Sequence, residues 1–125
     1  MADETICSLT LAEAAGAIRM GRVSSVEATE ACLARLKRRG GADDLNCVAG
    51  LDEDAAIAAA RAADAARTRG DEMGPLHGVP LAHKDMFFRP GRISACGSRI
   101  LAETPATTTA TVLEKLDRAG ALDIA

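Results

Sequence analysis

Helix start and stop signals divide the first seventy residues and constrain the fold of this chain more than any other feature. Segments 10–13 and 24–27 have the Ser/Thr-x-x-Glu pattern of a capping box, in which each side chain bonds the other residue's backbone N–H. Apolar residues then recur at helical spacing, first up to Gly21 and then up to Arg39, which two glycines follow. The pattern predicts two amphipathic helices joined by a tight turn.

An alanine-rich segment follows the second predicted helix. Asp52 or Asp54 caps a helix that runs to about Arg69 and ends before Gly70. A low-complexity linker is the alternative, but the interspersed charges and the cap and stop signals favour a helix. The intervening segment 46–51 is short and apolar, which favours a strand.

The second half of the chain alternates extended and helical segments. The apolar run 79–82 predicts an extended segment, and a turn-rich stretch follows it. A last helix starts at Thr109 or its neighbours and ends at Gly120, and residues 121–125 have the pattern of an opening strand. This alternation predicts an α/β fold. Because a strand normally has sheet neighbours, we expect the chain to be a fragment of something larger.

Composition limits the core and the partners. Alanine accounts for 27 of the 125 residues, whereas Leu, Ile, Val and Phe together account for 25, so we expect a small, poorly filled core. The formal net charge of −3 gives no basic footprint for nucleic acid or an anionic membrane. The basic cluster 37–39 is explained locally, since cations at a helix C-terminus complement the macrodipole.

The four cysteines and the N-terminus indicate a compartment. Cys7, Cys32, Cys47 and Cys96 are spaced too irregularly for a zinc site and suggest no disulfide scaffold. We expect ordinary buried or half-buried thiols in a reducing environment. The N-terminus is acidic where a signal peptide would be basic, and no apolar run approaches the roughly 18 residues of a membrane span. A cytoplasmic protein is expected.

Segment 77–85 carries the candidate chemistry, because it delivers Lys84 just after a glycine and a proline. A lysine becomes a useful base only when apolar surroundings or neighbouring cations lower its pKa from about 10.4 toward neutrality. The apolar residues 79–82 are expected to supply such surroundings. The alternative is an exposed lysine at a strand end that pairs with Asp85.

Several motifs resemble the amidase signature family. The run 74–85, Gly-Pro-Leu-His-Gly-Val-Pro-Leu-Ala-His-Lys-Asp, is similar to the segment in which that family places its catalytic lysine, Gly-x-Pro-x-x-x-Lys-Asp. Segment 91–98 resembles the Gly-x-x-Thr-x-x-Gly-Ser that follows in the family, and segment 110–121 resembles its next helix. The paired N-terminal helices and the alanine-rich helix also look like the family's opening region, so the resemblance covers nearly all of the chain.

The resemblance implies a fold, an activity and a division of the chain. It implies a large mixed sheet flanked by helices, of which residues 1–125 form the N-terminal part. The parts would be a helical region 1–70, a lysine-bearing strand with loops at 71–106, and a helix with the start of a strand at 107–125. The implied activity is hydrolysis of a small-molecule amide, or glutamine-fuelled amide transfer, by a Ser, cis-Ser, Lys triad that needs no cofactor.

In that triad Lys84 matches the lysine. Neutral lysine takes a proton from a bridging serine, which activates the nucleophilic serine, while backbone N–H groups of a glycine-rich loop stabilise the oxyanion. The family's Gly- and Ser-rich segment, which supplies both serines, lies downstream of this chain. Ser24 and Ser25 form the only adjacent serine pair, but they start a helix ahead of Glu27 and are explained as a cap.

We therefore expect the 125-residue chain alone to be inactive. A second hypothesis is a truncated, non-catalytic module that survives by pairing with another subunit. Whether the intact protein is a hydrolase or one component of an amidotransferase stays open.

The remaining polar residues of the region have local explanations. Asp85 is expected to be a structural acceptor rather than a catalytic acid, because adjacent strand residues point to opposite faces. His77 and His83 are six residues apart and lack companion ligands, so no metal site is expected. Ser98 either faces the site or bonds its own loop backbone.

Overall fold

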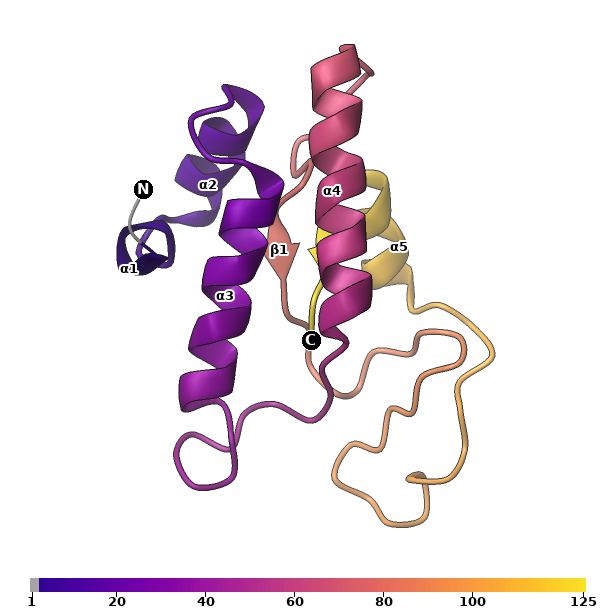
Figure 1. Ribbon diagram of the computed structural model, residues 1–125. Coiled ribbons are helices and arrows are strands. Elements are labelled where there is room, and N and C mark those ends of the chain that lie inside the picture. Colours follow the sequence, from indigo (N-terminus) through magenta and orange to yellow (C-terminus); the bar gives the residue numbers. More distant parts are fainter. Residues whose placement is uncertain (1–2) are drawn as a thin grey trace.

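Figure 1 shows the computed structural model, which describes residues 3–125; Met1 and Ala2, at the start of the predicted helical region, lie outside the described residues. Within residues 3–125 the chain forms five helices and two short strands, so the α/β prediction is confirmed. Every helix in this range is too short or too polar to traverse a lipid bilayer. The elements are α1 (Asp3–Ile6), α2 (Leu11–Arg19), α3 (Ser25–Arg39), α4 (Glu53–Arg69), β1 (Pro80–Leu81), α5 (Thr111–Arg118) and β2 (Leu122–Asp123).

Both predicted capping boxes are present. The Thr10 hydroxyl accepts a hydrogen bond from the Glu13 N–H at the start of α2, and the Glu13 carboxylate accepts one from the Thr10 N–H at 2.8 Å. At the start of α3, Ser24 and Glu27 repeat this exchange at 3.0 and 2.7 Å. The two helices therefore begin where local hydrogen bonding predicts.

The alanine-rich segment is a helix, as predicted. The Asp52 carboxylate caps α4 by accepting the Ala55 N–H at 3.0 Å, and Gly70 ends the helix in the left-handed conformation with φ of 78°. In Figure 1, α3 and α4 run side by side. The small side chains that α4 buries let the two helices approach closely; they are Ala56, Ala60 and Ala63.

The two strands are parallel neighbours although 40 residues separate them. Pro80 lies opposite Leu122 and Leu81 lies opposite Asp123. A parallel pair needs a crossover connection, and here a long loop and α5 provide it. That loop extends away from the helices (Figure 1). β1 contacts α3 and β2 contacts α4, so the helices hold the strands in place.

The core is small, as composition predicts. Of the thirteen apolar residues buried within the described chain, six are alanines. Large apolar side chains remain exposed on the crossover loop, and Ile100 is 88% exposed. The other exposed apolar residues of this loop are Met86, Phe88, Ile93 and Leu101.

One local prediction needs correction. Segment 46–51 is not a strand: after α3 the chain turns back, and the N–H groups of Leu45 and Cys47 bond the carbonyls of Arg39 and Gly40. Its backbone is thus engaged by the end of a helix and is not free for a sheet. The last helix begins at Thr111 with Ala110 as its N-cap, next to Thr109 as predicted, and no side chain caps it. The short helix α1 was not anticipated.

Glu27→Gln is expected to remove part of the acid sensitivity of folding. Hydrogen bonds from the Ser24 backbone N–H and hydroxyl lower the pKa of Glu27 below its ordinary 4.5. A carboxylate with a lowered folded pKa stabilises the fold above the unfolded pKa, and this contribution is lost as the pH falls through the folded pKa. In urea unfolding, the stability gap between wild type and variant should therefore close between about pH 6 and pH 3.

Glu30→Gln, the same change in the same helix outside the capping box, is the control for this experiment. A gap for Glu27→Gln that does not change with pH would contradict the capping role of the charge.

Candidate functional site

Lys84 lies three residues after β1, at a tight turn where its carbonyl accepts the N–H groups of Met86 and Phe87. Its side chain is exposed and, within residues 3–125, its ammonium makes no hydrogen bond or ion pair. The alternative of an exposed lysine is therefore right about the exposure of Lys84 but wrong about its pairing with Asp85. The expected apolar enclosure is also wrong for this chain, because Ala82 and Lys84 both face solvent.

The residues on either side of Lys84 are held firmly. The His83 N–H donates to the Ala125 carbonyl at 3.1 Å, which extends the pairing with β2. The Asp85 carboxylate accepts the Ala95 N–H at 3.2 Å, and its carbonyl accepts the Cys96 N–H at 3.1 Å. Asp85 is thus a local structural acceptor, as predicted. The backbone of Lys84 is fixed while its amine stays free.

Gly78, six residues before Lys84, is anchored by α3. The buried Ser25 hydroxyl donates to the Gly78 carbonyl at 2.6 Å, and the Gly78 N–H donates to the Gly120 carbonyl at 2.9 Å. The Asp64 carboxylate of α4 accepts the N–H groups of Ser25 and Val26 at 2.8 and 3.0 Å, where a carboxylate complements the helix dipole. Ser25 therefore has a structural role beyond the cap.

The two histidines form hydrogen bonds with different elements, His77 with α4 and His83 with β2. His77 Nε2 donates to the Ala63 carbonyl in α4 at 2.9 Å, and this partner fixes the tautomer, since a carbonyl can only accept. His83 Nδ1 lies 3.0 Å from Asp123 Oδ1 in β2. Within residues 3–125 no three potential metal ligands cluster together.

The serines of the following loop bond backbone. The Ser98 hydroxyl accepts the Ile100 N–H at 3.3 Å, so of the two alternatives for Ser98 the structure has the local bond. Ser94 was not anticipated: it is buried, and its hydroxyl donates to the Phe87 carbonyl at 3.1 Å, which closes the loop after Lys84. The sequence signal for this role was the position of Ser94, because the family motif Gly-x-x-Thr-x-x-Gly-Ser has a hydroxyl residue, threonine, at the same place.

An ion-pair cluster around Asp123 was also missed. The carboxylate lies 2.7 Å from Arg89 Nε and 3.0 Å from Arg92 Nη1, in addition to its contact with His83. Arg89 also donates to the two carboxylate oxygens of Asp117 in α5 at 3.0 and 3.1 Å. Hydrogen bonding to Asp117, and then the charges of both carboxylates, raise the pKa of Arg89 above its ordinary value. The sequence signal for this cluster was the charged Asp123 between the apolar residues Leu122 and Ile124, in a segment predicted to be a strand.

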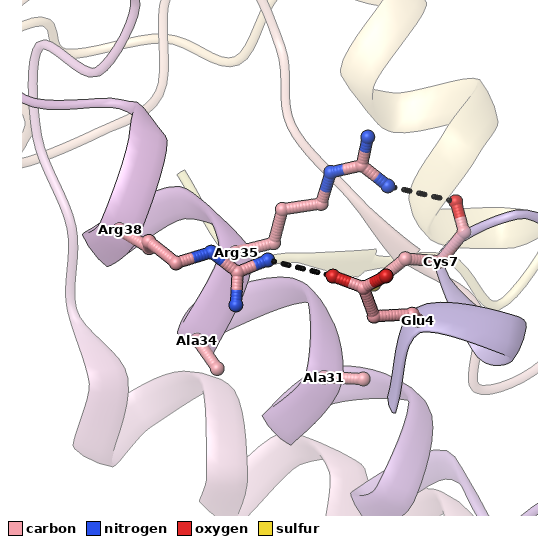
Figure 2. Close-up of a pocket in the computed structure, with 6 residues that line it drawn as sticks. All are labelled: Glu4, Cys7, Ala31, Ala34, Arg35 and Arg38. Atoms are coloured by element: carbon pink, nitrogen blue, oxygen red, sulfur yellow. Dashed lines mark hydrogen bonds and ion pairs between the residues drawn. The ribbon is translucent and has the colours of Figure 1, made fainter. Parts of the chain in front are cut away.

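A separate hollow lies between α1 and α3, and Figure 2 shows that its arginines already have partners. Arg38 reaches Glu4 at 3.4 Å, and Arg35 donates to the Cys7 carbonyl at 3.4 Å. Two small residues of α3, Ala31 and Ala34, complete the lining. These contacts hold α1 against α3, so we do not regard the hollow as a candidate site.

The basic cluster at the end of α3 has local partners too. Lys37 pairs with Glu53 of α4 at 2.8 Å, and Arg39 pairs with Asp44 in the following turn. All three basic residues, 37–39, lie in the last turn of the helix, where they complement its dipole. The local explanation of this cluster is confirmed.

The cysteines differ in exposure, and one expectation needs correction. Cys7 and Cys32 are half-buried, as expected, but Cys47 and Cys96 are exposed because both lie in loops. Burial, followed by the neighbouring Cys7, raises the pKa of the Cys32 thiol to about 11. Since the thiolate is the nucleophile, Cys32 is unsuited to nucleophilic catalysis.

Iodoacetamide is expected to alkylate Cys47 and Cys96 first and Cys32 last. A thiol with a pKa of about 11 is only about 0.1% ionised at pH 8, and only the thiolate reacts. The check is a time course by peptide mass spectrometry, with a sample in urea as the control in which the difference disappears. Cys32 reacting as fast as Cys47 in the folded protein would contradict the assignment.

Comparison with known proteins gives consistent matches. The family model described as Amidase matches residues 27–125. A curated relative, a glutamyl-tRNA(Gln) amidotransferase subunit from Chloroflexus aurantiacus, is 44% identical over 114 residues, which are 91% of this chain and 23% of the relative. The chain thus spans about a quarter of the length of the relatives it matches.

Solved structures match as well. A fatty acid amide hydrolase superposes with a TM-score of 0.88 at 25% identity, over 98% of this chain and 21% of the other. The native peptide amidase of Stenotrophomonas maltophilia superposes with a TM-score of 0.82 at 28% identity, over 94% of this chain and 24% of the other. The arrangement of helices around β1 and β2 is therefore shared with longer enzymes.

Proposed function

The chain belongs to the amidase family, the amidase signature enzymes, and from this premise we propose that the intact protein hydrolyses amide C–N bonds with Lys84 as its general base. One observation carries the proposal. Lys84 occupies the lysine position of the family motif, with a free amine on a backbone that is anchored on both sides. A base must be held in position and yet have no competing partner for the proton it accepts.

The proposed mechanism divides the work between this chain and the rest of a family-length protein. The neutral Lys84 amine accepts the proton of a bridging serine, and that serine accepts the proton of the nucleophilic serine as its Oγ attacks the amide carbonyl. The C–N bond then breaks, the leaving amine takes up a proton, and water hydrolyses the acyl-enzyme. Both serines and the oxyanion donors belong to the part of a family-length protein outside this chain.

We propose a small-molecule amide as the substrate. Two of the solved neighbours are named as a fatty acid amide hydrolase and a peptide amidase, and both names refer to an amide. The chemistry requires no cofactor. A cytoplasmic location stays our proposal, in keeping with four unpaired cysteines.

A second candidate function is amide transfer within a multi-subunit enzyme. It is favoured by the 44% identity to the amidotransferase subunit of Chloroflexus aurantiacus, which exceeds the identity to either hydrolase structure above. In that case the ammonia released at the Lys84 site would pass to a partner protein instead of to solvent. A non-catalytic module that pairs with another subunit is the third alternative.

The test compares ammonia release from a panel of amides by two proteins, the 125-residue chain and a family-length protein that contains it. We expect the longer protein to hydrolyse amides and the 125-residue chain to release no ammonia. Lys84-dependent turnover by the isolated chain would contradict the mechanism proposed here. Release that needs a co-purified subunit would favour amide transfer, and no release under any condition would favour the non-catalytic module.

A further inference from the structure

We infer that Asp123 is a positioning residue, whose carboxylate fixes the segment that carries Lys84. This inference rests on the proposed role of Lys84 as the base. Asp123 lies in β2, next to β1 in the sheet, and makes no hydrogen bond or ion pair with Lys84.

Three side chains converge on this one carboxylate: His83 and Arg92 lie within hydrogen-bonding distance, and Arg89 forms an ion pair with it. Oδ1 lies 3.0 Å from His83 Nδ1, while Oδ2 lies 2.7 Å from Arg89 Nε and 3.0 Å from Arg92 Nη1. All three side chains come from segment 83–92, which also contains Lys84. A single carboxylate thus holds the segment both immediately before the lysine and in the loop after it.

The environment of the Asp123 carboxylate makes its charge unfavourable unless the charge is paired. Its side chain is only 15% exposed, and its neighbours along the chain are Leu122 and the buried Ile124. Strands of parallel sheets are usually apolar, and a charge taken out of water is tolerated only when it is paired and hydrogen-bonded. Asp123 therefore requires its three partners, and the partners in turn have their places set by Asp123.

The geometry links this cluster to the position of the Lys84 amine. His83 is tied twice to residues 123–125, by its N–H to the Ala125 carbonyl and by its ring to Asp123. Since the Lys84 ammonium makes no hydrogen bond or ion pair within the described residues, the position of its amine depends on the backbone that carries it. Displacing a catalytic group by about 1 Å can cost about 100-fold in rate.

Asp117 offers a matched control. It accepts two hydrogen bonds from the same Arg89, at 3.0 and 3.1 Å, but makes no hydrogen bond or ion pair with His83 or Arg92. Asp117→Asn therefore removes one carboxylate charge from the same cluster while the attachment of His83 stays intact. Asp123→Asn removes the charge that His83, Arg89 and Arg92 share.

The first experiment measures amide hydrogen exchange by NMR in the 125-residue chain and both variants. Asp123→Asn is expected to raise exchange of the His83 N–H by at least about tenfold, with no change at amides in the middle of α3 such as Leu33. Asp117→Asn should leave the His83 rate unchanged. An unchanged His83 rate in Asp123→Asn, or an equal rise at His83 and Leu33, would overturn the inference.

The second experiment measures hydrolysis by the family-length protein. Asp123→Asn is expected to lower kcat per folded molecule by about 100-fold with KM changed by less than about twofold, whereas Asp117→Asn keeps wild-type kcat. A merely structural residue would lower the folded fraction and leave kcat per folded molecule unchanged, and that result would overturn the inference. If the wild type shows no Lys84-dependent hydrolysis, the proposed function fails, and the exchange rates alone decide what Asp123 holds.

Discussion

Lys84→Ala in the family-length protein is expected to lower kcat for amide hydrolysis by about 10²–10⁴-fold, with little change in KM. The reason is the proton transfer: without the amine, no group at this position can accept the serine proton as the nucleophile attacks. Substrate binding should survive, because the Lys84 backbone is held by contacts of His83 and Asp85 that the substitution leaves in place. The measurement is steady-state ammonia release over a range of amide concentrations.

Two further variants sharpen this test. Lys84→Arg keeps a positive charge, but a guanidinium stays protonated and cannot act as a base, so we expect it to be as inactive as the alanine variant. Lys115→Ala removes another exposed lysine, on α5, and should keep wild-type rates. Activity of Lys84→Arg near that of the wild type would show that the charge, rather than proton transfer, is what this position supplies.

Gly78→Ala is expected to destabilise the fold by about 3 kcal/mol or more. Gly78 has φ of +74°, a backbone conformation that residues with a side chain rarely adopt. An added Cβ would lie 2.9 Å from the Ser25 hydroxyl oxygen and 3.3 Å from Ile18 Cγ2. Ser25 cannot easily move, because it is fully buried and its hydroxyl bonds the Gly78 carbonyl. The substitution would therefore push the lysine-bearing segment away from α3.

Gly91→Ala is the matched control for this prediction. Gly91 has nearly the same backbone conformation, with φ of +77°, but an added Cβ would meet no atom within 4 Å. It should lose only the cost of the left-handed conformation, about 1 kcal/mol. Urea unfolding of both variants gives the comparison, and equal losses would show that contact with Ser25 is not what fixes Gly78.

The helices were predictable because their signals are local. The capping boxes of α2 and α3, and the Asp52 cap and Gly70 stop of α4, each involve residues close together in sequence, and all are present. Segment 46–51 failed for the opposite reason. Its apolar residues favoured a strand, but a strand needs a distant partner, and the end of α3 took up its backbone N–H groups instead.

The candidate site was predictable only in part. Lys84 was identified from a motif contained in twelve consecutive residues, and its role stays a proposal. The Asp123 cluster was not identified, because it depends on parallel pairing that places residue 123 beside residues 81 and 83, far away in sequence. The positions of the charged residues along the sequence cannot reveal that β1 and β2 pair. In the same way, the cap explained Ser24, but only the fold shows that Ser25 anchors the lysine-bearing segment.

The central claim is that Lys84 acts with two serines that follow it in a longer protein. The most direct test is to sequence the DNA beyond the codon for Ala125. The account predicts an in-frame continuation into a glycine- and serine-rich segment that supplies both serines. A stop codon directly after Ala125 would contradict it, because a protein ending there would lack the nucleophile that Lys84 is proposed to activate.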